Sequence, residues 1–223
     1  MHALIPAAGT GSRAGEGAPK QYRLLAGKPL IEHTLAAFSQ VARLASVLVV
    51  VAPDDTHLQE APGRRIARRG GATRAASVAN GLQVLLEAGA QEEDWVLVHD
   101  AARCLVTPEL VHRLIGACVP DRVGGLLALP LGDTLKEEAQ GRVATTVPRS
   151  GKWLAQTPQM FRLGVLRQAL AHCGDRVTDE ASAVEAFGLQ PLLVPGSALN
   201  FKVTWPEDFL LAEAVLRSRE QAP

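Results

Sequence analysis

The sequence predicts an α/β fold with a doubly wound, mostly parallel, Rossmann-like sheet that is flanked by helices and carries an inserted β arm. Two short, continuous apolar runs, 46–51 and 95–99, are typical of strands buried on both faces. Segments with apolar residues at helical spacing, 30–38 and 73–88, lie before and between these runs. Such strand–helix–strand alternation implies parallel strands that are joined by right-handed crossovers.

Length and composition favour one domain that spans residues 1–223. The 23 basic and 23 acidic side chains give a formal net charge of zero, so the sequence predicts neither nucleic acid nor a membrane as a partner. Every apolar run is too short for a membrane span, and no signal-peptide pattern precedes the first strand, which predicts a cytoplasmic protein. The three cysteines, Cys104, Cys118 and Cys173, are widely spaced and are expected to be reduced.

The first predicted strand leads from Leu4 into a glycine-rich loop, 9–20. Glycines let the backbone curl so that its N–H groups approach an oxyanion, and Arg13 and Lys20 add positive charge. We therefore expect this loop to bind a polyphosphate. The P-loop pattern is absent, because no glycine immediately precedes Lys20.

A dinucleotide site is the alternative for this loop, because Gly9, Gly11 and Ala14 fit the loose G-x-G-x-x-[GA] fingerprint. That fingerprint opens a helix at once, whereas Pro19 and further glycines prolong this loop. The strand at 46–51 also ends without the acidic residue that holds a ribose in dinucleotide sites. Both features count against this alternative.

The remaining elements follow from local signals. Asp54 and Asp55 can cap a short helix, and 64–69 is expected to form an exposed strand. Thr107 before Pro108 is a typical helix start. Further strands are predicted at 124–130 and 190–194, and a loop or strand pair at 196–203. Helices are predicted at 107–118, at 163–172, at 206–217 and in a segment that begins at 178.

The segment 132–153 interrupts this alternation. Val143, Thr145 and Val147 alternate with other residues, and helical periodicity is weak, so the segment is predicted to form a β arm. An isolated hairpin is marginally stable in water, so we expect the arm to pack on a partner subunit in a homodimer, with a solvent-exposed hairpin as the alternative.

Four polar clusters follow predicted strands, at 9–20, 70–77, 100–103 and 196–202. Open α/β sheets bind their ligands at the carboxyl ends of the strands, so the four clusters are expected to form one site. The motifs in these clusters and after them resemble those of the 2-C-methyl-D-erythritol 4-phosphate cytidylyltransferase family, in one order along almost the whole chain. They are Pro6-Ala7-Ala8-Gly9-x-Gly11-x-Arg13, Pro19-Lys20-Gln21, Val98-His99-Asp100-Ala101-Ala102-Arg103, Asp133-Thr134-Leu135-Lys136, Thr157-Pro158-Gln159, Thr178-Asp179-Glu180-Ala181-Ser182 and Asn200-x-Lys202-Val203-Thr204.

The resemblance implies that the chain transfers the cytidylyl group of CTP to 2-C-methyl-D-erythritol 4-phosphate and releases pyrophosphate, in the non-mevalonate route to isoprenoids. An anionic phosphate must attack an anionic α-phosphate in line, so charge neutralisation and positioning supply most of the catalysis. By resemblance, Arg13, Lys20 and Lys202 are catalytic, and Asp100 holds Mg2+ beside the triphosphate of CTP. For Asp100, a cap of the following helix is the alternative.

The resemblance also implies binding residues for both substrates. The nucleotide is expected to contact Ala7, Ala8, Gly9, Gly11, Gly71, Ala72, Ser77 and Ala101. The acceptor is expected to contact Arg103, Thr134, Arg149, Thr157 and Thr178, of which Thr134 and Arg149 act across the dimer interface. A helix N-cap is the alternative for Ser77, a turn or N-cap for Thr157 and Thr178, and a structural ion pair for Arg103. Ala72 and Cys104 depart from the family pattern.

Two other functions stay open from the sequence. One is a related cytidylyltransferase that acts on ribitol 5-phosphate, since the opening loop belongs to a wide class of sugar-nucleotide transferases. The other is a non-catalytic nucleotide-binding module, which would need the phosphate loop but not the acceptor residues.

Overall fold

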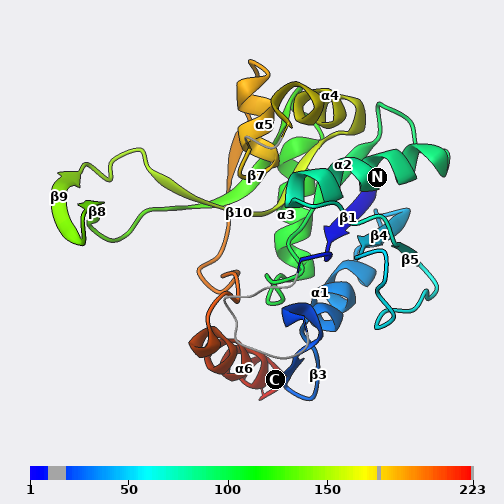
Figure 1. Ribbon diagram of the computed structural model, residues 1–223, viewed down its shortest axis with the longest axis horizontal. Coiled ribbons are helices and arrows are strands. Elements are labelled where there is room, and N and C mark those ends of the chain that lie inside the picture. Colours follow the sequence, from blue (N-terminus) through cyan, green and yellow to red (C-terminus); the bar gives the residue numbers. More distant parts are fainter. Residues whose placement is uncertain (10–18, 175–176, 222–223) are drawn as a thin grey trace.

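The computed structural model describes residues 1–9, 19–174 and 177–221, and has one seven-stranded sheet between two layers of helices (Figure 1). The strand order is β11 (Leu192–Pro195), β7 (Gly124–Pro130), β10 (Trp153–Arg162), β6 (Trp95–Val98), β1 (His2–Pro6), β4 (Ser46–Val50) and β5 (Arg64–Ala67). β10 is antiparallel to both of its neighbours, and the other pairs are parallel. The predicted fold class is confirmed.

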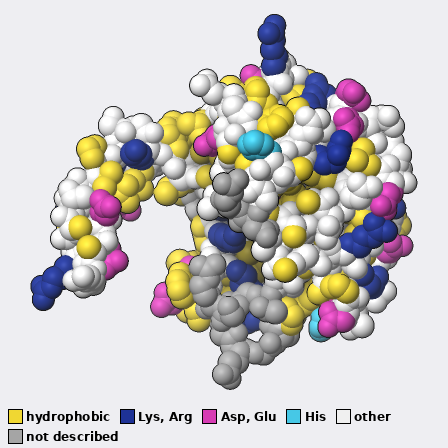
Figure 2. Space-filling model, turned by 45° about the horizontal axis from the view of Figure 1, so that its top comes forward, with side chains coloured by type: hydrophobic (Ala, Val, Ile, Leu, Met, Phe, Trp, Pro, Cys, Tyr) yellow, Lys and Arg dark blue, Asp and Glu magenta, His cyan; other side chains and the backbone are white. Residues whose placement is uncertain are grey.

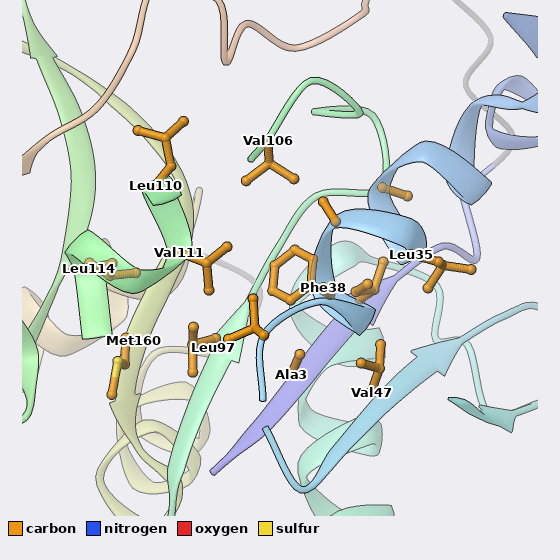
Figure 3. Close-up of a cluster of buried hydrophobic side chains, with 14 of the residues drawn as sticks. Ala3, Leu35, Phe38, Val47, Leu97, Val106, Leu110, Val111, Leu114 and Met160 are labelled. Atoms are coloured by element: carbon orange, nitrogen blue, oxygen red, sulfur yellow. The ribbon is translucent and has the colours of Figure 1, made fainter. Parts of the chain in front are cut away.

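Helices cover both faces of the sheet because successive side chains of a strand point to opposite faces. Ala3 and Ile5 of β1 face α1 (Leu30–Ser39) and α3 (Pro108–Cys118), where Phe38 and Leu114 complete one core (Figure 3). Leu4 between them faces the other core, built with α2 (Arg74–Glu87), α4 (Leu163–Cys173) and α5 (Glu180–Ala186). The continuous apolar runs of the sequence therefore fill two cores at once.

Two regions differ from their predicted structure. The predicted helix after Asp54 and Asp55 is wrong, because residues 53–58 contain only a turn at 53–54 and a bend at 57. The Asp55 carboxylate accepts the N–H groups of His57 and Leu58. Ahead of α1, the chain forms the 3-10 helix η2 (Lys20–Tyr22) and a small hairpin of β2 (Leu24–Leu25) and β3 (Lys28–Pro29). Residues 196–203 form a loop that leads to α6 (Pro206–Gln221).

The arm is a separate two-stranded sheet of β8 (Leu135–Ala139) and β9 (Arg142–Val147), which projects away from the body of the molecule (Figures 1 and 2). Most of its residues are exposed, including the apolar Val143 at 64%. The predicted β structure of the arm is confirmed, and its role in dimerisation stays a prediction. Within the described residues, no helix is both long and apolar enough to cross a membrane.

Candidate active site

A cleft of about 490 Å3 opens at the carboxyl ends of β1 and β6. The described parts of all four predicted polar clusters meet there. The cleft is lined by Pro6, Ala7, Ala8, Gly9, Lys20, Gln21, Gly71, Ala72, Thr73, Arg74, Ser77, Asp100, Ala101, Ala102 and Lys202. The structure thus brings together ten of the predicted site residues. Gly11 and Arg13 lie outside the described residues.

One wall of the cleft depends on small residues at close approaches. A Cβ atom on Gly70 would lie 2.3 Å from the Cβ of Ala8, and one on Gly71 would lie 2.5 Å from the Cβ of Ala76. Both distances are shorter than any real contact, so glycine is required at both positions. The backbone of 70–72 can therefore approach β1 closely and form a flat wall.

Ser77 shapes this wall from inside helix α2. Its buried hydroxyl accepts the N–H of Gly71 at 3.0 Å and donates to the carbonyl of Thr73 at 3.0 Å. Thr73 is the N-cap of α2 and accepts the N–H of Ala76. The N-cap alternative for Ser77 is therefore wrong, because the helix begins four residues earlier than that role requires.

Asp100 is the electrostatic centre of the cleft. Its Oδ1 accepts from Nε of Arg74 at 2.8 Å, and its Oδ2 lies 2.9 Å from Nζ of Lys202 and 3.8 Å from Nε of Arg103. Burial alone raises the pKa of this carboxyl, but the three cations outweigh burial and hold the pKa well below its usual range. Asp100 is therefore ionised at neutral pH and fixes the position of three positive charges.

The two predicted catalytic lysines reach this region from opposite ends of the chain. Lys20, in η2, donates from Nζ to the backbone carbonyl of Val203 at 2.7 Å. Lys202, the residue before Val203, extends from the loop after β11 to Asp100. The two ammonium groups therefore both border the cleft beside the same loop, as expected for groups that neutralise a polyphosphate.

His99, at the end of β6, is fully buried and makes two hydrogen bonds. Nδ1 of His99 lies 3.1 Å from Oγ1 of Thr157, and Nε2 of His99 lies 3.2 Å from the carbonyl of Arg103. The Thr157 hydroxyl also accepts the N–H of Asp100 at 3.0 Å. A carbonyl needs a donor, so Nε2 carries the proton and Nδ1 accepts from the Thr157 hydroxyl. Burial lowers the pKa of His99 to about 3. His99 is a packed histidine that holds the Asp100 turn.

Arg103 and Thr157, two of the predicted acceptor residues, lie behind the cleft. The Arg103 guanidinium donates to the carbonyls of Asn200 at 2.8 Å and Ala155 at 3.1 Å. Asn200 in turn donates from Nδ2 to the carbonyl of Thr157 at 2.9 Å. These bonds tie the loop that carries Lys202 to β10, so both residues have internal partners in the free protein.

Three other predicted acceptor residues do not line the cleft in a single chain. Thr134 and Arg149 are exposed at the base of the arm, where Arg149 donates to the carbonyl of Gly132. Thr178 lines a smaller pocket. The N-cap of α5 is Asp179, which forms a capping box with Ser182, so the N-cap alternative for Thr178 is wrong.

Arg74 and Glu180 were not predicted from the sequence as site residues. Arg74 lines the cleft, and its guanidinium binds Asp100 on one side and the buried carboxylate of Glu180 on the other. Burial alone lowers the pKa of Arg74, but the two carboxylates outweigh it and raise the pKa. The sequence did contain a signal for Arg74. This basic residue directly follows a capping threonine and comes shortly after a pair of glycines.

The residues fit a magnesium ion that arrives on a triphosphate. Magnesium usually keeps several waters and takes one or two protein carboxylates beside phosphate oxygens, and Asp100 is such a carboxylate at the cleft. Among the described residues, no group of three or more histidine, cysteine or acidic side chains is arranged to hold a metal. A magnesium ion held by Asp100 would share its coordination with the ligand's phosphates, and Oδ2 of Asp100 would release or share Lys202.

Cys104 stands where the family pattern usually has proline, and its side chain is buried beside the cleft. Burial raises the pKa of its thiol to about 12. At pH 8 the thiolate that reacts with alkylating agents is therefore rare. We expect iodoacetamide to leave the native protein active and Cys104 unlabelled by mass spectrometry, with labelling complete in urea. Rapid native labelling of Cys104 would contradict its burial.

Comparisons with known proteins point to one family. A family profile described as 2-C-methyl-D-erythritol 4-phosphate cytidylyltransferase matches residues 1–218. The "Bifunctional enzyme IspD/IspF" of Albidiferax ferrireducens is 65% identical over 97% of this chain, which spans 53% of that protein's length. The 2-C-methyl-D-erythritol 4-phosphate cytidylyltransferase of Laribacter hongkongensis is 60% identical over 96% of this chain and 95% of its own.

Solved structures show the same similarity in three dimensions. A crystal structure of 4-diphosphocytidyl-2C-methyl-D-erythritol synthase superposes with a TM-score of 0.87 at 44% identity, over 96% of this chain and 97% of that one. The 2-C-methyl-D-erythritol 4-phosphate cytidylyltransferase of Francisella tularensis superposes with a TM-score of 0.83 at 34% identity, over 96% and 98% of the two chains.

Proposed function

The chain belongs to the 2-C-methyl-D-erythritol 4-phosphate cytidylyltransferase family, and we propose that its cleft performs the reaction that gives the family its name. CTP and 2-C-methyl-D-erythritol 4-phosphate react to give 4-diphosphocytidyl-2-C-methyl-D-erythritol and pyrophosphate, a step of non-mevalonate isoprenoid synthesis. The observation that carries the proposal is the convergence of Lys20, Lys202 and Asp100 on one cleft beside small-residue loops.

The geometry suits a reaction between two anions. The acceptor phosphate attacks the α-phosphorus of CTP in line, the bond to the β-phosphate oxygen breaks, and pyrophosphate leaves. Lys20 neutralises the charge on the α-phosphoryl oxygens and the leaving group, together with Arg13. Lys202 neutralises the incoming phosphate. Repulsion between the two anions opposes their approach, so these preorganised cations supply the main catalytic effect.

The cytosine and ribose of CTP are placed on the wall formed by Ala7, Ala8 and 71–72. The tight packing of Gly70 on Ala8 leaves backbone groups, and no long side chain, at this wall. Backbone groups can read the cytosine edge by hydrogen bonds, so Ala72 is compatible with CTP even though the family pattern has an acidic residue there. Gly11 and Ala101 complete the proposed nucleotide contacts.

Mg2+ is part of the proposal, with Asp100 as its protein ligand. Bound there, it would neutralise part of the triphosphate charge and help the pyrophosphate to leave. A cytoplasmic location is also part of the proposal.

The proposal includes a homodimer in which the arm of one subunit completes the site of the other. The exposed apolar residues of the arm and its base, Leu135, Val143, Trp153 and Leu154, support packing on a second copy. Thr134 and Arg149 then contact the acceptor in the partner's cleft, while Arg103, Thr157 and Thr178 serve it from within the chain.

A direct assay tests the proposed function. Pyrophosphate release is measured with CTP and Mg2+ and with either 2-C-methyl-D-erythritol 4-phosphate or ribitol 5-phosphate as the acceptor. We expect turnover with the first acceptor and at most a trace with the second. Full activity with ribitol 5-phosphate alone would favour the related cytidylyltransferase, and tight CTP binding without turnover on any acceptor would favour a binding module.

The shared site predicts complementation between two variants when activity is measured at an acceptor concentration well below the wild-type KM, where both variants have low activity. R149A should chiefly raise the acceptor's KM, by about tenfold or more, because it removes a charge-assisted contact. A heterodimer of R149A and K20A contains one site with both wild-type residues, so purified heterodimers should regain roughly half of the wild-type activity per dimer. Stable heterodimers that stay as inactive as their parents would contradict a shared site.

A further inference from the structure

Glu180 is a buried carboxylate near the cleft that the reaction described above does not use. It is the first residue of α5, and its side chain is 1% exposed. Arg74 lines the cleft, whereas Glu180 does not. A buried carboxylate is costly unless it is paired, so a fixed partner is required.

Arg74 is that partner, and the contact is bidentate. Nη1 of Arg74 donates to Oε1 of Glu180 at 2.6 Å, and Nη2 donates to Oε2 at 3.0 Å. The guanidinium is planar and rigid, so two parallel bonds fix both its plane and its rotation. The direction of the remaining Nε–H is therefore set by Glu180.

That Nε–H points at the catalytic cleft. It donates to Oδ1 of Asp100 at 2.8 Å, which leaves Oδ2 for Lys202 at 2.9 Å. The backbone N–H of Asp100 is held separately by Thr157. With its backbone and one oxygen held, the Asp100 carboxylate has one orientation, and Lys202 is placed by the other oxygen.

We propose that Glu180 is a positioning residue for cytidylyl transfer, which acts through Arg74 and Asp100 to place Lys202. Glu180, Arg74 and Asp100 come from the first turns of α5 and α2 and from the turn after β6, so the chain of contacts joins three elements far apart in the sequence. Glu180 also balances charge, because three cations, Arg74, Arg103 and Lys202, surround Asp100. This inference rests on the proposed function.

The Glu180→Gln variant tests the proposal with little change in shape. A glutamine accepts from one Nη, but its own amide N–H groups oppose the other, so the bidentate contact is lost. We expect kcat to fall by about 10- to 100-fold, the range typical of partners that orient catalytic ligands. The KM for CTP should change less than threefold or fall, because the cleft loses a negative charge nearby.

Several controls separate positioning from stability. Calorimetric titration with CTP gives the number of intact nucleotide sites, and kcat is expressed per site. E180D, which keeps the charge, should retain more activity than E180Q. R74K keeps a positive charge but loses the bidentate contact, and the E180Q/R74K double variant should be no worse than the poorer single variant. E185Q, at an exposed position of the same helix, should match the wild type.

A kcat per CTP site within twofold of the wild type in E180Q, with only a lower melting temperature, would overturn the positioning role. If E180Q does not fold, E180D and R74K decide the question, and wild-type kcat per site in both would overturn it. A wild-type protein that shows no turnover with CTP and 2-C-methyl-D-erythritol 4-phosphate would contradict the proposed function instead, so the two failures are distinguishable.

Discussion

Replacing Lys20 by alanine is expected to lower kcat at least 100-fold, while the KM for CTP changes less than about fivefold. Deletion of one preorganised electrostatic donor typically costs a factor of about 100 to 1,000 in turnover. Lys20 borders the cleft and is proposed to neutralise charge that grows on the α-phosphoryl oxygens and the pyrophosphate. The benefit is largest in the transition state, so kcat should carry most of the loss.

Steady-state pyrophosphate release with CTP and 2-C-methyl-D-erythritol 4-phosphate measures this effect. K28A is the matched control, because Lys28 is an exposed lysine on the small hairpin just after η2. A K20A enzyme whose KM for CTP rises as much as its kcat falls would make Lys20 a binding residue. Unchanged kinetics would remove Lys20 from the site.

Asp100→Asn is the second substitution with a large expected effect, and it should reduce both activity and stability. The amide removes the negative charge that holds Arg74, Arg103 and Lys202, each of which lies within 4 Å of the Asp100 carboxylate. Removing one partner of a buried ion pair typically costs about 3–5 kcal/mol, because the remaining charge is buried without compensation. We expect the free energy of unfolding to fall by an amount near the lower end of this range, because the Lys202 side chain is 40% exposed. We also expect kcat to fall at least 100-fold.

Urea unfolding followed by circular dichroism measures the stability, and D54N is the control at an exposed aspartate in a surface turn. The pKa of Asp100 is lowered in the folded protein, so its contribution to stability is complete above the unfolded pKa of about 3.9 and declines as the pH falls below it. The difference between wild type and D100N should therefore shrink below about pH 4. An equal difference at pH 3 and pH 7 would contradict this assignment.

Most of the fold was predictable because buried parallel strands leave a strong signal. The run Ser46–Val50 is apolar and β-branched since both of its faces are covered, and Thr107 with Pro108 marks the start of α3 by capping chemistry alone. The antiparallel direction of β10 was not predictable, because a strand buried on both faces has the same pattern in either direction.

The candidate site was predictable where loops follow strands and less so where contacts are long-range. Asp100 and Lys202 were found because each lies in a polar cluster after a strand. The Arg74–Glu180 contact joins residues 106 positions apart. A glutamate in the first turn of a helix is ordinarily explained by its favourable interaction with the helix dipole. Nothing local distinguishes such a glutamate from one that is buried and paired.

The reversed direction of β10 has a consequence for how this fold can change during evolution. β7 ends and β10 begins at the same edge of the sheet, the one where the cleft opens, since β10 runs antiparallel to β7 with Trp153 paired to Pro130. Segments of different length and sequence can therefore be inserted between these strands without disturbing either core, and each emerges at the ligand-binding edge. With the arm in its proposed role at the acceptor, acceptor preference can diversify through this insertion while the nucleotide machinery is preserved, and designed libraries can use the same position.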